Sequence, residues 1–515
     1  MSLRVFVARD ASALSVGADA TAASIAAEAE KRGEPVTIVR TGTRGMLWLE
    51  PLVEVETPKG RMAYGPVTPA DVASLCDAGL LRGDAGAHAL SLGPTEQLPW
   101  MARQQRVSFA RVGVIDPLSL SDYSAHGGMA GLERARGMSS EAIVQEVITS
   151  GLRGRGGAGF PTGIKWRTVR EAESPRKYIV CNADEGDSGT FADRMLMEGD
   201  PFALLEGMCI AGLAVGATHG FVYIRSEYPH AIDTMRRAIV IAREAGMLGP
   251  VFNVDVRVGG GAYVCGEETS LLESLEGKRA VVRAKPPLPA HHGLFARPTV
   301  INNVLSLAAV PSILAQGGAV YAAHGLGRSR GTMPVQLAGN IRHGGLFECD
   351  FGITLRELIL DLGGGTYSGR PVRAAQVGGP LGAYFPDALL DTPLDYEAMA
   401  AAGGLLGHGG IVVFDDTVDM AAQARFAFEF CAVESCGKCT PCRIGSTRGA
   451  ETLDKVAQGV DPDANLALVE DLCTVLTDAS LCALGGLTPM PVMSALRHFR
   501  EDFTPRTSVT TGGAV

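Results

Sequence analysis

The chain has 515 residues, more than one compact core usually organises, so several domains are expected. Hydrophobic residues make up 46% of the sequence and charged residues 20%, as in ordinary globular proteins, and a net charge of −10 argues against nucleic-acid binding. The start, MSLRVFVARD, lacks the apolar segment of a secretory signal, so we expect a cytoplasmic location, where clustered cysteines favour metal binding over disulfides.

The first predicted elements form a small α/β unit that extends to about residue 90. Strands are predicted at 3–8 and 36–41, with an Ala-rich helix at 20–32 between them. A polar region with Gly and Ser near 117–138 predicts a linker. A helix follows at 140–149.

An alternation of strands and helices from 151 to about 330 predicts an α/β core. The longest apolar stretch, 203–224, contains Glu206 and His219. These polar residues favour a buried helix followed by a strand, so no membrane insertion is expected.

Two further units complete the chain. Residues 334–365 predict a hairpin and then a helix that begins with Thr354 and Glu357 in a capping box, which indicates a small α+β domain. After about 417 the apolar spacing becomes helical and predicts a bundle.

The stretch ESCGKCTPCRIG (434–445) places three cysteines three residues apart, a tight loop that can offer three thiolates to one iron–sulfur cluster. Cys482 and Cys473 are the downstream candidates for the fourth thiolate. Cys473 follows the apolar helix pattern and favours a core position, whereas Cys482 lies in a turn. Cys431 fits helix packing. Structural zinc is the alternative, but zinc sites usually present two separated pairs.

Glycine-rich and polar loops predict contact with an anionic or ring-bearing ligand. Five glycines fall within 151–159, followed by Phe160 and Trp166, which a merely flexible surface loop would rarely carry. The match to a dinucleotide fingerprint is only formal, because the loop follows a helix. The flanking cations are Arg153, Arg155 and Lys165.

Four later stretches could contribute polar groups: CNADEGDSGT (181–190), VRVGGGAYVCGEETSLLESLEG (256–277), KPPLPA (285–290) and Asn302-Asn303. Each also has a plainer interpretation. The acids of the first could form a solvated or calcium-like turn, the glutamates of the second could cap a helix, and paired Asn is common in turns.

In this order along the chain, GLRGRGGAGFPTGIKW, CNADEGDSGT, GAYVCGEETSLLESLEG, KPPLPA, PTVINNV and ESCGKCTPCRIG resemble the flavin-containing, NADH-oxidising 51 kDa-type subunit of respiratory complex I and its soluble relatives. The resemblance covers about residues 130–505. It implies FMN, NAD and a [4Fe–4S] cluster, with FMN carrying the chemistry and no catalytic residue of the protein itself.

The resemblance also assigns individual residues. FMN binding falls to Gly154, Gly156, Gly157, Lys165, Asn182, Asp184, Glu185, Asn302 and Asn303. The NAD site would be lined by Phe160, Asp187, Glu268 and Lys285, and the cluster would be held by Cys436, Cys439, Cys442 and Cys482. Asp187 replaces a Glu found in many members, and Thr168 and Leu288 replace Phe found in some, so the preference between NAD and NADP stays open.

The implied architecture is a multidomain α/β protein. Its domains would be a thioredoxin-like domain without a cluster (1–115), a linker (116–138), an α/β domain for FMN and NAD (139–333), a small ubiquitin-like, SLBB-type α+β domain (334–412) and a helical [4Fe–4S] domain (413–515).

The N-terminal region indicates which relatives within this family the chain resembles most. Residues 52–75 resemble the end of the thioredoxin-like [2Fe–2S] subunit that partners this family, yet the region offers only Cys76, and 39–45 (VRTGTRG) has Arg, Thr and Gly near where ligand cysteines would fall. A fused, clusterless docking domain resembles the β subunit of soluble, molybdenum-containing, NAD-dependent formate dehydrogenase.

The implied function is to pass electrons from a molybdenum/iron–sulfur formate-oxidising subunit through the [4Fe–4S] cluster and FMN to NAD+. A small [2Fe–2S] thioredoxin-like subunit is a further expected partner. The alternatives are the NADH-oxidising subunit of complex I or of an NAD-reducing hydrogenase and, from another class, a non-redox binding protein stapled by zinc.

Overall fold

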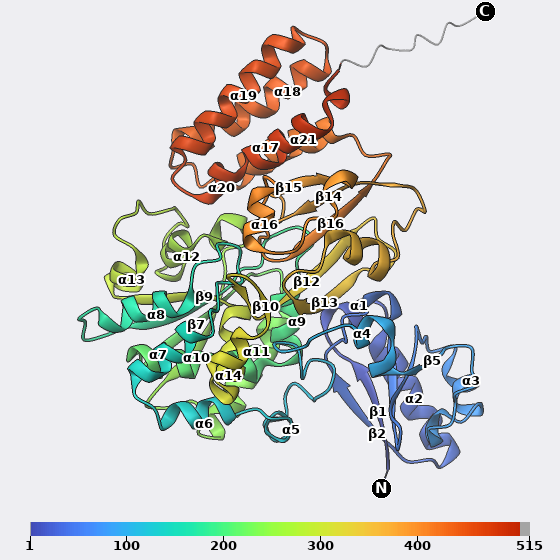
Figure 1. Ribbon diagram of the computed structural model, residues 1–515. Helices are drawn as coiled ribbons and strands as arrows, with labels where there is room; N and C mark the ends of the chain where they lie inside the picture. Colours follow the sequence, from blue (N-terminus) through green and yellow to red (C-terminus); the bar gives the residue numbers. More distant parts are fainter. Residues whose placement is uncertain (1, 505–515) are drawn as a thin grey trace, which may run out of the picture.

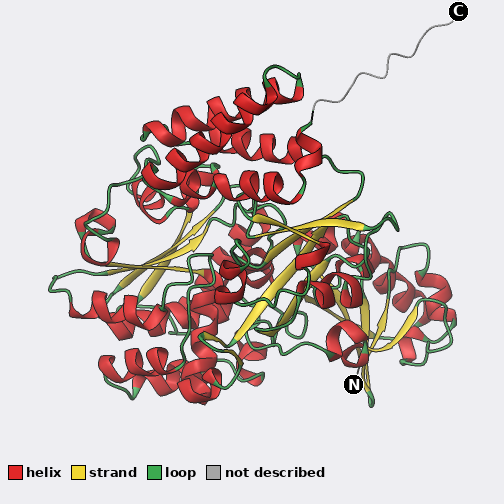
Figure 2. Cartoon of the chain, turned by 45° about the horizontal axis from the view of Figure 1, so that its top comes forward, coloured by secondary structure: helices red, strands yellow, loops and turns green. Residues whose placement is uncertain are grey.

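The computed structural model describes residues 2–504 and shows a mixed α/β chain with several sheets (Figure 1). Within that range no helix is both long and apolar enough to cross a membrane. Helices and strands alternate through the lower part of the molecule, and a group of helices lies at the top of the view (Figures 1 and 2).

The N-terminal unit is built on a five-stranded sheet in the order β2-β1-β3-β4-β5. β1 and β2 are parallel, and the other pairs are antiparallel. The strands are β1 (Leu3–Ala8), β2 (Val36–Thr41), β3 (Val53–Thr57), β4 (Gly60–Tyr64) and β5 (Ser91–Pro94), and the helices are α1 (Ala11–Ser15), α2 (Ala18–Arg32), α3 (Val72–Asp77) and α4 (Pro99–Ala102). Both predicted strands and the predicted helix are confirmed.

The predicted linker is wrong, because residues 116–138 contain α5 (Leu120–Ala125) and α6 (Ala130–Arg136). Tyr123 and Leu132 of these helices are buried in the central core. Glu206, fully buried on α10 (Pro201–Val215), accepts hydrogen bonds from Tyr123 Oη (2.5 Å) and from the backbone N–H groups of Met129 and Leu132 (both 2.8 Å). The segment is therefore anchored to a buried carboxylate of the central unit.

We expect Glu206→Ala to lower the free energy of unfolding by about 3 kcal/mol or more, because two buried donors and one partly buried donor would lose their acceptor at about 1–3 kcal/mol each. Urea denaturation followed by circular dichroism measures the loss. Glu133→Ala, which removes an exposed acid on α6, is the matched control. Equal unfolding midpoints for the two variants would contradict the anchoring role.

The central unit contains a four-stranded parallel sheet in the order β8-β7-β6-β9. Its strands are β6 (Tyr178–Ala183), β7 (His219–Ile224), β8 (Asn253–Val258) and β9 (Thr299–Asn303). The remaining helices of the unit are α7 (Ser140–Thr149), α8 (Thr162–Glu171), α9 (Ala192–Gly199), α11 (Pro229–Glu244), α12 (Glu268–Leu275), α13 (Pro289–His292), α14 (Val304–Gln316) and α15 (Gly318–Ala322). The buried helix and strand predicted within 203–224 are confirmed as α10 and β7.

The third unit is a five-stranded sheet in the order β13-β12-β16-β14-β15, preceded by the two-residue strands β10 (Gly325–Leu326) and β11 (Ser329–Arg330). The strands are β12 (Thr332–Gly339), β13 (Gly345–Asp350), β14 (Val372–Val377), β15 (Ala383–Pro386) and β16 (Gly410–Asp415), with helix α16 (Tyr396–Ala401). The β12–β13 hairpin and the Thr354–Glu357 capping box are confirmed. The boundaries at 334 and 412 are shifted, because they cut into β12 and β16, which pair at the centre of this sheet.

The last unit is the predicted helical bundle, which packs on β15 through its final helix. It comprises α17 (Met420–Glu434), α18 (Ser446–Ala457), α19 (Pro462–Ala479), α20 (Ala483–Leu487) and α21 (Pro489–His498). The three-cysteine stretch lies between α17 and α18, on the side of the bundle that faces the central unit (Figure 1).

Candidate functional site

The predicted ligand residues gather at the carboxyl edge of the parallel sheet. β7 and β8 extend from one side of β6, and β9 pairs on the other side, so the topology switches between β6 and β9. At this point Cys181 pairs with Asn302 and Asn182 with Asn303. Open α/β sheets bind ligands in the crevice at such a switch point, and the structure brings the two Asn-bearing segments together there.

The glycine-rich loop after α7 folds back on itself and covers the end of β9. Gly154 N–H donates to the Phe160 carbonyl over 2.8 Å, and Thr162 N–H donates to that of Leu152. A Cβ on Gly156 would lie 2.9 Å from Cβ of Asn303, so only glycine allows this approach. The loop thereby presents backbone at the sheet edge.

Two of the three cations that flank this loop are used by the protein itself. Arg155 is buried and donates to the carbonyl groups of Thr332 and Arg330, which tie the loop to the third unit. Arg153 pairs with Glu397 on α16 (2.6 Å). Lys165 is therefore the flanking cation that remains at the sheet edge.

Lys165 lies within a cluster of alternating charges. Its Nζ donates to the Ile301 carbonyl (2.9 Å) and lies 3.9 Å from Glu268, which pairs with Lys285 over 2.7 Å. Burial lowers the pKa of Lys165. Burial opposes the charge of Glu268, yet Lys165 and Lys285 hold the pKa of that carboxyl below its usual range. Glu267 also pairs with Lys285 and caps α12, so the capping interpretation holds for Glu267.

The loop after β6 carries an acceptor with no partner. Asn182 donates to the Gly266 carbonyl (2.8 Å) and accepts the backbone N–H of Asp184 (3.2 Å). Oδ2 of Asp184 is buried and has no hydrogen-bond partner, and burial raises the pKa of this carboxyl to about 7. Buried polar atoms are normally paired, so an unpaired oxygen here fits a site that a ligand completes.

Other residues predicted to bind FMN or NAD make hydrogen bonds within the protein. The two carboxylate oxygens of Glu185 accept the backbone N–H groups of Asp193 and Arg194 at the start of α9. Asn303 caps α14, and Asp187 accepts the Tyr263 hydroxyl (2.8 Å). Phe160 is half exposed. A close glycine loop, the Lys165 ammonium at the sheet edge and an unpaired acceptor nevertheless fit FMN with its phosphate, ribityl chain and ring edges.

The cysteines form a second group beside this edge. Cys442 is buried, and Cys436, Cys439 and Cys482 pack half-buried with it in a shell that includes Val264, Val282, Leu381 and Leu484. Cys482 precedes α20, where a Cβ on Gly485 would lie 2.9 Å from Cβ of Cys442. Cys473 instead belongs to the core of the bundle. Four thiols in one apolar shell fit a [4Fe–4S] cluster.

Cys431 was predicted to serve packing, and the structure places it in the same shell. It is fully buried, and its Sγ lies 3.7 Å from Sγ of Cys442. The helical spacing of α17 does not reveal this contact, which depends on how the helix meets the cysteine loop.

The cysteine group is joined to the sheet edge by polar contacts. Glu434 accepts the Tyr263 backbone N–H (2.8 Å), and Lys438 donates to the Val282 carbonyl (2.6 Å). A cavity of about 340 Å³ beside Cys436 is lined by Arg279 and Arg443. Positive charge there suits a negatively charged cluster.

The N-terminal unit has a buried pair of acids, Asp10 and Glu50, beside Thr43, in the stretch where the resemblance would place cluster cysteines. Thr43 donates to Asp10 through its backbone N–H (3.0 Å) and to Glu50 through its hydroxyl (2.5 Å). Burial, together with the Asp10 charge, raises the pKa of Glu50 to about 8. Cys76 is buried in the hydrophobic core of this unit.

We expect the stability of this unit to decrease between pH 6 and 8.5. A raised carboxyl pKa favours folding fully below the ordinary value of 4.5, and this contribution is lost as the pH rises through about 8, at up to ~1.4 kcal/mol per pH unit. Thermal unfolding followed by circular dichroism at a series of pH values measures this. Glu50→Gln should flatten the slope, whereas the exposed Glu56→Gln should leave it; equal slopes would contradict the assignment.

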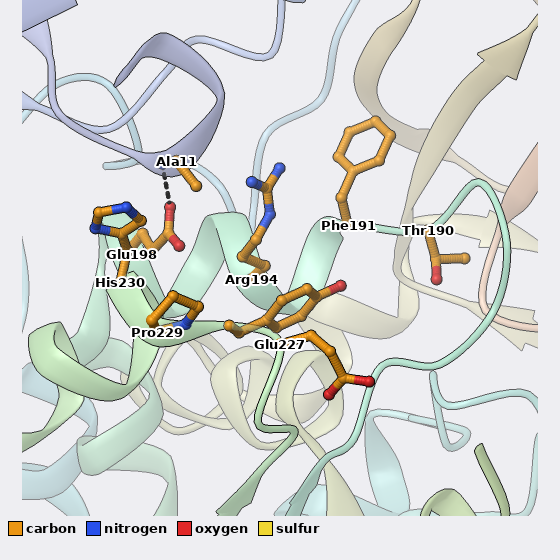
Figure 3. Close-up of a pocket in the computed structure, with 9 residues that line it drawn as sticks. Ala11, Thr190, Phe191, Arg194, Glu198, Glu227, Pro229 and His230 are labelled. Carbon is orange, nitrogen blue, oxygen red and sulfur yellow. Dashed lines mark hydrogen bonds between the residues drawn. The ribbon is translucent and has the colours of Figure 1, made fainter. Parts of the chain in front are cut away.

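The cavity in Figure 3 has a volume of about 440 Å³ and borders the predicted cofactor site, because Tyr228 and Arg194 in its lining hydrogen-bond Glu185. It lies where α1 meets α9 and the start of α11, and Glu198 accepts the Ala11 backbone N–H there (2.7 Å). None of the residues predicted to bind FMN or NAD lines it. Its position marks the junction of the N-terminal and central units.

Comparisons with known proteins agree with this geometry. Residues 147–312 match the Nuo51 FMN-binding domain, and residues 422–506 match the NADH-ubiquinone oxidoreductase-F iron-sulfur binding region. Each match contains one of the two groups described above. The first spans the glycine-rich loop and the Asn pair, and the second spans all four predicted cluster cysteines.

Two similar proteins differ in the complexes they are named for. The chain is 46% identical to the F 2 subunit of the NADH-quinone oxidoreductase of Rhizobium meliloti, over 77% of this chain and 96% of that protein. It is 44% identical to the NADP-reducing hydrogenase subunit HndC of Solidesulfovibrio fructosivorans, over 78% and 83%. A chain of the NAD+-reducing [NiFe]-hydrogenase is 31% identical with a TM-score of 0.69, and the match covers 98% of this chain and 84% of that one.

Proposed function

The chain belongs to the family of NADH-quinone oxidoreductase F subunits, the 51 kDa-type flavin subunits, and from this premise we propose that it is the NAD-reducing subunit of a formate dehydrogenase. As a family member it binds FMN, a [4Fe–4S] cluster and NAD(H). FMN, when bound, exchanges a hydride with nicotinamide and single electrons with a cluster.

The chain's own residues would bind and orient these groups. The glycine-rich loop would supply backbone N–H donors, Lys165 a cation and Asp184 an acceptor, while Asn302 is fixed by the Trp166 indole N–H (2.8 Å). The contacts of Tyr263 with Asp187 and Glu434 would keep the nucleotide side and the cysteine loop in one arrangement. No side chain here needs to act as a nucleophile.

The choice of formate dehydrogenase depends on the N-terminal unit. Its single cysteine is buried in its core, and the Thr43 region holds buried acids, so this unit suits docking without a cluster of its own. The proposed partners are a molybdenum/iron–sulfur formate-oxidising subunit and a small [2Fe–2S] subunit. A hydrogenase role is the second candidate, favoured by the whole-chain likeness to the NAD+-reducing [NiFe]-hydrogenase.

Elemental analysis of the complex that copurifies anaerobically with the tagged chain from its native host tests this. Molybdenum or tungsten with iron, together with formate-dependent NAD+ reduction, is the expected result. Nickel would instead indicate a hydrogenase. Iron as the sole metal, in a membrane-bound assembly, would indicate complex I. A colourless, zinc-containing protein would contradict the family's cofactors altogether.

A further inference from the structure

His408 lies in a glycine-rich turn of the third unit, and its side chain contacts residues of the central unit. The turn precedes β16, and its flanking residues Gly407 and Gly409 have φ of 61° and 78°, which side chains rarely adopt. The His408 carbonyl accepts the side-chain amide of the buried Gln336 (2.9 Å). The ring is 4% exposed, so the turn delivers an imidazole into a closed environment.

Both ring nitrogens face groups that only accept hydrogen bonds. Nδ1 lies 2.6 Å from the Arg155 carbonyl, and Nε2 lies 3.2 Å from Glu185 Oε1 and 3.3 Å from Asp193 Oδ1. A neutral imidazole has one N–H and would leave one of these contacts without a donor. The geometry therefore calls for the doubly protonated, cationic ring.

The charges around the ring agree with this. Burial opposes a charged ring, but the carboxylates of Asp193 and Glu185 raise the pKa of His408 well above its ordinary value. Asp187 adds a further negative group nearby, and the hydroxyl of Tyr228 lies beyond Glu185, 3.2 Å from its Oε2. No other cation is within ion-pair distance of these two carboxylates among residues 2–504.

The partners of the ring belong to three different segments of the predicted flavin site. Arg155 lies between Gly154 and Gly156, Glu185 follows Asp184, and Asp193 accepts the side-chain N–H of Asn303 over 2.6 Å. We propose that His408 is a positioning residue for FMN, whose imidazolium holds the glycine-rich loop, the loop after β6 and the Asn303 amide in the arrangement that accepts the flavin. This inference rests on the proposed FMN residues and is independent of the electron donor.

A metal ion is the competing interpretation of these three side chains, since their ligand atoms lie within 4.8 Å of one another. The imidazolium explains the contacts more fully. Nε2 lies at hydrogen-bond distance from Glu185 and at ion-pair distance from Asp193 Oδ1, an oxygen that has no hydrogen-bond partner. Each carboxylate already accepts other donors: two backbone N–H groups for Glu185 and the Asn303 amide for Asp193.

FMN titration of the flavin-depleted full-length chain, followed by quenching of flavin fluorescence, tests the proposal. His408→Gln should weaken FMN binding at least tenfold at pH 7, with an unchanged circular dichroism spectrum. The FMN affinity of the wild type should decrease at alkaline pH, because the His408 ring then loses its second proton. The FMN affinity of His408→Gln should not show this decrease. His324→Gln, which breaks a half-exposed pair with Asp350 in the same part of the chain, should bind FMN like the wild type.

Asp193→Asn is the second test of the proposal and can be used if His408→Gln fails to fold. This variant keeps an acceptor for the Asn303 amide and removes one negative charge beside the His408 ring. Its alkaline loss of FMN should occur at lower pH than in the wild type. Affinity of His408→Gln within twofold of the wild type, an unshifted midpoint in Asp193→Asn, or a stoichiometric non-iron metal lost on substitution would each overturn the proposal. A wild-type chain that binds no FMN would instead refute the assignment of the site.

Discussion

Replacing Cys482 with serine is expected to empty the cluster site while FMN remains bound. Cys482 packs in the same apolar shell as Cys436, Cys439 and Cys442, and a [4Fe–4S] cluster needs four thiolates. Loss of a ligand should cost at least the ~10- to 100-fold in metal affinity that follows from losing a supporting residue. Iron and acid-labile sulfide per chain, measured beside flavin absorbance, report the two cofactors separately.

Cys473→Ser is the matched control for this experiment. Cys473 is buried in the core of the bundle between helices, nine residues before Cys482, and should keep its iron. Iron retained in Cys482→Ser but lost in Cys473→Ser would show that the fourth ligand has been wrongly assigned. Cys431→Ser adds a useful comparison, because that thiol contacts Cys442 without being one of the four predicted ligands.

Lys165→Ala is expected to weaken FMN binding by about 10- to 100-fold. The ammonium lies at the switch point with one hydrogen bond to the protein, and a hydrogen bond to a charged group contributes about 1.5–3 kcal/mol. The affected quantity is the dissociation constant for FMN, measured on the flavin-depleted chain. Protein stability should decrease only modestly, because within the protein the Lys165 ammonium donates one hydrogen bond, to the Ile301 carbonyl, and makes one long ion pair, 3.9 Å from Glu268.

Lys177→Ala tests whether FMN binding depends on the position of the lysine or only on the loss of one positive charge. Lys177 also donates to a backbone carbonyl, that of Arg170 (2.7 Å), but it lies just before β6, at the opposite end of that strand from Asn182. Its removal should leave FMN binding unchanged. If both variants bound FMN like the wild type, Lys165 would have no role in the flavin site.

Local patterns predicted most elements because short-range chemistry decides them. The strand at 3–8, the capping box at Thr354 and Glu357, and the buried helix and strand within 203–224 all follow from residue spacing and are confirmed. The prediction of a linker at 116–138 is wrong because it, too, used only local composition. The polar composition of the segment is typical of a linker, and the Glu206 carboxylate that anchors it lies 74 to 83 residues further along the chain than the groups it contacts.

The candidate site was predictable only in part. Six motifs in order identified the family and its cofactors, which the comparisons confirm. The individual FMN and NAD residues remain predictions. No local pattern connects Arg153 with α16, Arg155 with the third unit, or Cys431 with the cysteine loop, because each contact joins segments that are distant along the chain or meet only on packing.

By itself the sequence determined the ligand chemistry of this protein: clustered thiols, a glycine-rich loop and a set of amides and acids at fixed positions along the chain. These depend on residue type and spacing, which are local. Only the tertiary structure decided which side chains are left for a ligand. Arg155 and Glu185 make several hydrogen bonds within the protein, whereas Lys165 makes one and Asp184 keeps an unpaired oxygen. His408 is more than two hundred residues from the groups that it contacts, because burial and charge pairing are settled only when distant segments pack together.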